Sequence, residues 1–97
     1  MHLIHAHLIG PGVLLPPGTA SVLLDVAPPH IRLEHAVVHQ EWSGEAVIGV
    51  YLLAADARQA RTQAIRLFLL VTRPEGTLSG WLLVDLPGPL LNGLKGP

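Results

Sequence analysis

Ala46-Val47-Ile48-Gly49-Val50-Tyr51-Leu52-Leu53 is the stretch of this chain that decides its fold. It is rich in β-branched and apolar residues, and these fall on both of the faces that an extended strand presents. This pattern is typical of a central strand that is covered on both sides. We therefore predict that residues 46–53 lie in the interior of a β-sheet.

The segment before this strand predicts its hairpin partner. Residues Ile31 to Gln40 alternate well enough for a strand, and Glu41-Trp42-Ser43-Gly44 supplies the turn. One face of this strand should carry Ile31, Leu33, His35, Val37 and His39, and the other should carry Arg32, Glu34, Ala36 and Val38. The two strands should pair antiparallel.

The segment after the central strand changes to helical periodicity. It begins at Ala55, with Asp56 near the N-terminus, and Pro74 and Gly76 end it. Its apolar face should comprise Ala57, Ala60, Ala64, Leu67, Phe68 and Val71, opposite Arg58, Thr62, Gln63 and Arg66. Leu69 and Leu70 fall among the polar positions, so the helix either unwinds there or contacts something apolar. Leu78 to Leu86 predicts a last strand, closed by Pro87-Gly88-Pro89.

The N-terminal part predicts one strand and one short helix. Residues His2 to Ile9 form an apolar and histidine-containing strand that Gly10-Pro11-Gly12 ends. Thr19 is a plausible N-cap for a helix over Ala20 to Val26, which Pro28-Pro29 would stop. A strand over Ser21 to Val26 is the alternative, because its valines and leucines fit either structure.

The resulting order is strand, short helix, strand, strand, long helix, strand. This is the split βαβ, or ferredoxin-like, arrangement. We predict one α+β domain over residues 1–97, with a four-stranded antiparallel sheet, both helices on one face, and an irregular tail over about 87–97. The central strand should lie next to the first strand. The second face of the sheet stays open, and we expect the chain to form a homodimer through it.

Composition limits the kind of partner. Hydrophobic residues make up 49% of the chain and charged residues 13%, which is about half the usual charged share. The net charge is −1 and no basic run is present, so we expect no nucleic-acid partner. No stretch approaches the ~20 apolar residues that span a membrane, and the start lacks a signal-peptide pattern. The absence of cysteine fits a cytoplasmic protein.

Histidine is the most distinctive residue type. The six histidines all precede Glu41, at His2, His5, His7, His30, His35 and His39. His5 and His7 share one face of the first strand, and His35 and His39 share one face of the second. The central strand separates the two pairs by roughly 9–10 Å.

Three neutral imidazoles with an open position form a competent site for a divalent transition metal. The candidate ligands are His5, His7, His35 and His39, with Asp25, Glu34 or Glu41 as the candidates for an additional carboxylate ligand. The alternative is that the histidines are half-exposed strand residues. We expect no other cofactor.

No catalytic motif stands out. Ser21, Ser43 and Ser79 lie outside any G-x-S-x-G elbow, so we predict no catalytic residues. Trp42, in a turn, is an exposed aromatic side chain suited to stacking on a ligand, whereas Tyr51 and Trp81 lie inside predicted strands and suit packing or an interface. The candidate ligand-binding residues are His35, His39, Trp42 and Trp81.

Three functional hypotheses follow. The first is a small non-catalytic module that acts as a homodimer and binds a small ligand or a partner protein. At the level of fold alone, the predicted order also resembles the dimeric α+β barrel proteins, which include cofactor-free monooxygenases and cyclases. That resemblance implies a substrate pocket between helices and sheet, lined by the candidate ligand-binding residues. The third hypothesis is metal binding, as a carrier or sensor.

Overall fold

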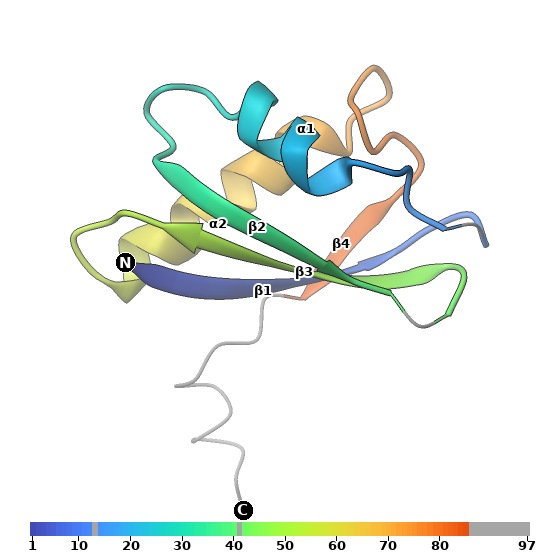
Figure 1. The fold of residues 1–97 in the computed structure, drawn as a ribbon, viewed down its shortest axis with the longest axis horizontal. Helices are drawn as coiled ribbons and strands as arrows, with labels where there is room; N and C mark the ends of the chain where they lie inside the picture. The colour runs from blue at the N-terminus through green and yellow to red at the C-terminus, as the bar shows by residue number, and fades with distance from the viewer. Residues whose placement is uncertain (13, 41, 86–97) are drawn as a thin grey trace, which may run out of the picture.

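A computed structural model describes residues 1–12, 14–40 and 42–85 and shows an α+β fold. Its elements are β1 (His2–Ile9), α1 (Thr19–Val26), β2 (Leu33–His39), β3 (Glu45–Leu52), α2 (Ala57–Val71) and β4 (Leu82–Asp85). The strands form one open antiparallel sheet in the order β2-β3-β1-β4 (Figure 1). This order confirms that β3 lies in the interior, next to β1. The predicted tail lies outside the described residues.

The core lies between one face of the sheet and the two helices. Alternate residues of β1 and β3, such as Ile4, Ile48 and Val50, are buried in the same cluster as Leu23 of α1 and Phe68 of α2. Both helices therefore cover the same face of the sheet, as predicted (Figure 1). Each such large apolar side chain contributes about 1.5–3 kcal/mol through its burial.

The prediction that β3 is covered on both sides is met on one side only. Ala46, Ile48, Val50 and Leu52 face the helices and are buried. On the other face Val47 and Tyr51 are only half-buried. The apolar residues of this second face therefore belong to the open side of the sheet.

The short helix α1 confirms the helical prediction for this segment, and the alternative strand is wrong. Its N-cap is Gly18, at φ 78°, and not Thr19. Thr19 is instead the first helical residue, and its buried hydroxyl donates to the carbonyl of Pro16 at 2.6 Å. Because Thr19 is itself a helical residue, it does not occupy the N-cap position.

Strand β2 is shorter than predicted and contains a bulge. The ladder with β3 shifts register between Leu33, the partner of Leu52, and His35, the partner of Tyr51. Because Glu34 is an extra residue at this point, Leu33 faces the helices while His35 faces the open side. The prediction that these two residues share a face is therefore wrong. Ile31 precedes the strand and is buried.

Helix α2 starts two residues later than predicted, at Ala57. Asp56 is its N-cap, because the side chain accepts a bond from the Gln59 amide at 2.8 Å. Ala57 is exposed and does not belong to the apolar face. The helix does not unwind at Leu69 and Leu70. It continues to Val71, and Leu69 is 58% exposed.

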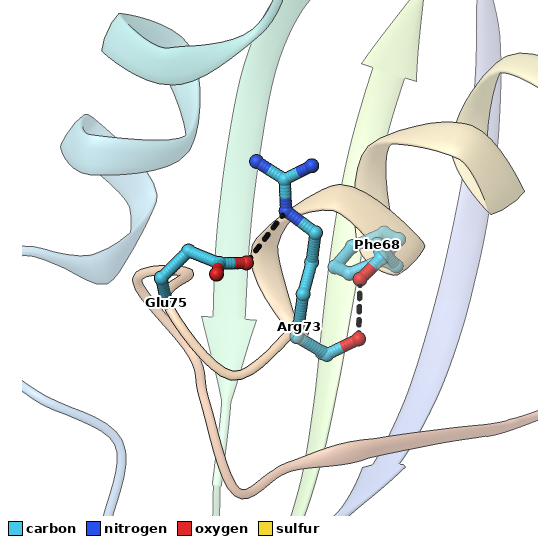
Figure 2. A network of polar contacts seen from close by, with 4 residues as sticks. Phe68, Arg73 and Glu75 are labelled. Carbon is cyan, nitrogen blue, oxygen red and sulfur yellow. Dashed lines mark hydrogen bonds and ion pairs between the residues drawn. The ribbon is translucent and has the colours of Figure 1, made fainter.

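The connection from α2 to β4 replaces the first part of the predicted last strand. Figure 2 shows the end of α2, where the Phe68 carbonyl accepts the Thr72 hydroxyl at 2.7 Å and Arg73 Nε lies 3.6 Å from Glu75 Oε1. The Leu78 amide then donates to the carbonyl of Val71 at 2.7 Å. These bonds hold residues 77–80 in turns, so β4 begins only at residue 82. Leu86 lies outside the described residues.

We predict that Gly10→Ala destabilises the protein by about 1–3 kcal/mol, because overpacking forces neighbouring groups to shift. A Cβ at Gly10 would clash with the indole ring of Trp81, a residue that is 3% exposed. The matched control is Gly49→Ala, where the nearest atom, Leu3 Cδ1, is 3.4 Å away. Urea unfolding should show a large loss for the first variant and a change below about 1 kcal/mol for the second. Equal losses would contradict the packing described.

Candidate functional site

The side of the sheet away from the helices has no covering element in the described part of the chain. We call it the open face. The antiparallel registers assign to it Leu3, His5, His7 and Ile9 of β1, His35, Val37 and His39 of β2, Glu45, Val47, Gly49 and Tyr51 of β3, and Leu82 of β4. This set contains no lysine or arginine and four histidines.

The open face places all four candidate metal ligands on one surface. His7 and His39 are both register partners of Val47, so its side chain stands between them. His5 and Val37 are the partners of Gly49. Gly49 therefore has a histidine on one side and a valine on the other. The space above it does not bring two histidines together.

The rings of His5 and His35 also have different neighbours. The ring of His5 lies over Gly49, with its Nε2 3.7 Å from the position of an added Cβ. The ring of His35 packs on Tyr51, with ring centroids 5.7 Å apart. Among the residues that the structure describes, no three His, Asp or Glu side chains are placed to hold a metal ion. Metal binding stays a prediction.

Trp42 lies in the β2–β3 hairpin, and hydrogen bonds fix the backbone of this hairpin. Its carbonyl accepts the side-chain amide of Gln40 at 3.1 Å, and Gln40 Oε1 accepts the Leu15 amide at 2.7 Å. The Gly10 amide donates to the carbonyl of Gly44 at 2.9 Å. These bonds tie the hairpin to the segment that follows β1. The Trp42 side chain is nevertheless 69% exposed.

A shallow cleft lies beside this tryptophan, at one end of the open face. Its volume is about 220 Å³, and its lining comprises His39, Trp42, Glu45, Ala46 and Val47. The cleft thus brings together two of the four predicted ligand-binding residues. It combines an indole, an imidazole and a carboxylate.

The other two predicted ligand-binding residues lie elsewhere. Trp81 is 3% exposed and packs on Gly10 in the core, and it precedes β4. His35 lies beside Tyr51 and does not line the cleft. Glu45 and Val47 line the cleft but were not predicted from the sequence. The alternation along β3, which places both on the same face as Tyr51, is the pattern that could have identified them.

The space between helices and sheet bears on the barrel-enzyme hypothesis. Phe68, Leu23 and Ile48 fill this space and are fully buried. A hydroxyl nucleophile would need a histidine as its base. The hydroxyls of Thr19, Thr62 and Thr72 donate instead to backbone carbonyls. A substrate pocket in the place implied by the resemblance would require these core side chains to move.

Comparisons with protein-family models, with curated proteins and with solved structures found no match to this chain. In the described part of the chain, neither helix has the length and hydrophobicity needed to cross a bilayer.

The metal hypothesis makes a specific prediction. If the open-face histidines bind zinc, the double variant His5→Ala, His7→Ala should lose most of the binding measured by calorimetry, because it removes half of the candidate ligands. The variant keeps the terminal amine and His2, so weak binding at the N-terminus remains as an internal control. An unchanged titration would exclude a site built on these two histidines.

Proposed function

We propose that this chain is a non-catalytic binding module of ferredoxin-like architecture that acts as a homodimer through its open face. The observation that carries this proposal is the composition of that face. Leucine, isoleucine, valine and tyrosine alternate with histidine, and Glu45 is its only described side chain with a formal charge at pH 7 when histidine is neutral. A surface of this kind gains free energy when it leaves water.

A second copy is the occupant that this face fits. The four strands, of eight, seven, eight and four residues, present about 430 Å² of sheet per copy, from strand rise and spacing. Two copies would bury about 860 Å², which is the size of a weak or transient interface. A two-fold axis brings the same patch of both copies together. An uncharged, apolar patch is self-complementary in this arrangement, whereas a charged patch would repel its copy.

The cleft beside Trp42 supports the binding part of the proposal. Glu45 supplies a negative charge, the exposed indole supplies a π face, and no described lysine or arginine lines the cleft. A cation placed over an indole is attracted by the ring quadrupole, and a carboxylate adds to this attraction. The ligand class that fits is a small organic cation such as an ammonium compound.

We predict that Leu82→Glu shifts the protein from dimer to monomer. Leu82 lies on the open face and is 63% exposed, so the substitution should leave the fold of each copy intact. Burying an unpaired carboxylate in the interface should raise the dimer dissociation constant by at least about 100-fold, because each 1.4 kcal/mol is a factor of ten. Sedimentation velocity across a concentration series measures this shift.

The matched control is Leu69→Glu on α2. Leu69 is 58% exposed and lies on the helical side of the molecule. This variant should keep the wild-type dissociation constant. A wild-type protein that is monomeric at high concentration, or two variants with equal effects, would contradict assembly through the open face.

The cleft makes a separate prediction. Choline should quench or shift the fluorescence of Trp42 in the millimolar range, and its neutral isostere 3,3-dimethylbutanol should not. Trp81 is buried and serves as a constant background. Trp42→Ala should abolish the signal.

In the chain that retains Trp42, Glu45→Gln should weaken choline binding about threefold to fivefold, from the strength of an exposed ionic contact. Glu75→Gln, which lies outside the cleft, should have no effect. Equal responses to both compounds would exclude the cation site.

A further inference from the structure

The N-terminal half of β1 has an open edge on the side away from β3. The Gly10 amide donates to the Gly44 carbonyl, so in this register the even-numbered residues of β1 direct their backbone groups toward β3. The odd-numbered residues direct theirs to the other side, where β4 pairs only with residues 7–9. Within the described ranges, the N–H and C=O groups of Leu3 and His5 therefore have no ladder partner. Near its N-terminus, β1 forms the margin of the sheet (Figure 1).

The sequence that follows β4 cannot supply the missing donors in the same register. Beyond Asp85, a continued ladder would set Pro87 opposite His5. It would then set Pro89 opposite Leu3. Proline has no backbone N–H, so neither position could donate a hydrogen bond to β1. These are the two positions at which the edge needs a donor, and a strand from another molecule can provide both.

One flank of α2 faces the side of the sheet on which this edge lies. α1 packs mainly on β2 and α2 mainly on β1, and Val26 of α1 lines the same cavity as Leu70 of α2. Arg61 lies about 180° around α2 from Leu70, at ~100° per residue, so it is on the flank that faces away from α1. Arg58 and Ile65 share this flank through their i, i+3, i+7 spacing with Arg61.

The first turns of this flank lie at the same end of the sheet as the open edge. Leu52, the last residue of β3, is the register partner of His2, and α2 begins shortly afterwards at Ala57. Arg58 is exposed, and Ile65 is partly buried against the core. Helix α2 contains no acidic residue. A strand added at this edge would therefore meet a flank that is positively charged and partly apolar.

We propose that residues 2–6 of β1 bind an extended acidic peptide segment of a partner protein as an additional antiparallel strand. The amides and carbonyls of this segment bond to those of Leu3 and His5. Its side chain opposite Ile4 points to the helical side, where an apolar residue suits the side of α2 that carries Ile65. Acidic side chains on either side of it are attracted by the two arginines of this flank. The inference concerns the edge of the sheet and not the open face, so it does not depend on dimerisation.

Fluorescence anisotropy with a labelled peptide tests the inference. The probe is fluorescein-Glu-Thr-Val-Thr-Glu-amide, whose two threonine amides would bond to β1. We expect saturable binding in the millimolar range or tighter. The same peptide with both threonine amides methylated should bind at least about tenfold more weakly, because it lacks two ladder donors. Equal binding of the two peptides, or no saturable binding of the first, would overturn the inference.

Variants assign the binding to this edge. Arg58→Gln combined with Arg61→Gln should fold normally by circular dichroism and weaken probe binding about threefold to tenfold, from two exposed ionic contacts. The matched control is Arg66→Gln, because Arg66 lies one turn before Leu70 on the side of α2 nearer α1. It should keep the wild-type dissociation constant. Equal losses in both variants would overturn the assignment to this flank.

The oligomeric state distinguishes this inference from the proposed function. Leu82→Glu, the variant expected to be monomeric, should bind the probe with the wild-type dissociation constant. A wild-type monomer that binds the probe would overturn the proposed dimer and support the peptide site. Loss of probe binding in Leu82→Glu would overturn the edge as its location. Dissociation of a wild-type oligomer by the probe would show that a second copy occupies the edge, and would overturn its assignment to a partner peptide.

Discussion

The pairing of β1 with β3 is the constraint on which the rest of the structure depends. The two strands run antiparallel over their full length, from His2 opposite Leu52 to Ile9 opposite Glu45. Side chains alternate between the faces of a strand, so this single register decides which residues enter the core and which remain outside. A shift by one residue would bury His5 and His7 and expose Ile4 and Ala6.

The same register determines the properties of the two faces. Apart from His2 at the start of β1, the covered face contains only apolar side chains along β1 and β3, and α1 and α2 together are enough to cover it. The chain has no third helix among its described residues with which to cover the other side. Apolar residues at Val47, Val37 and Leu82 therefore lie on a surface that this chain does not cover in its described part. Their presence there is the physical reason to expect a second copy.

Much of the fold was predictable because it depends on periodicity. The strand His2–Ile9 and the core face of α2 from Ala60 to Val71 follow directly from alternation and helical spacing. The errors occurred where a single hydrogen bond or an extra residue changes the local geometry. The bulge at Glu34 reverses the face of Leu33, and the bond from the Leu78 amide to Val71 delays β4. Sequence patterns carry no signal for either feature.

The candidate site was predictable to the same extent and for the same reason. Alternation placed His5 with His7 on one face of the first strand and His35 with His39 on one face of the second, but the ladder decided that the pairs share a surface and which residues separate them. Val47 between His7 and His39, and Val37 across Gly49 from His5, are consequences of register between distant segments. The Trp42 cleft likewise requires the hairpin turn, whose bracing by Gln40 and Gly44 involves residues far apart in sequence.

The choice of histidine on the open face has a physical consequence of its own. An exposed sheet face in a monomer is usually kept soluble by lysine and glutamate, which stay charged at all physiological pH values. Such residues would prevent two copies from meeting. A face composed only of leucine and valine would associate without control and expose the protein to aggregation. Histidine lies between these extremes, because it is buried in proteins more readily than lysine or glutamate and is still polar enough to hydrogen-bond water. The four histidines of the open face, with no lysine or arginine among its described residues, therefore give a polar surface without a strong charge of one sign.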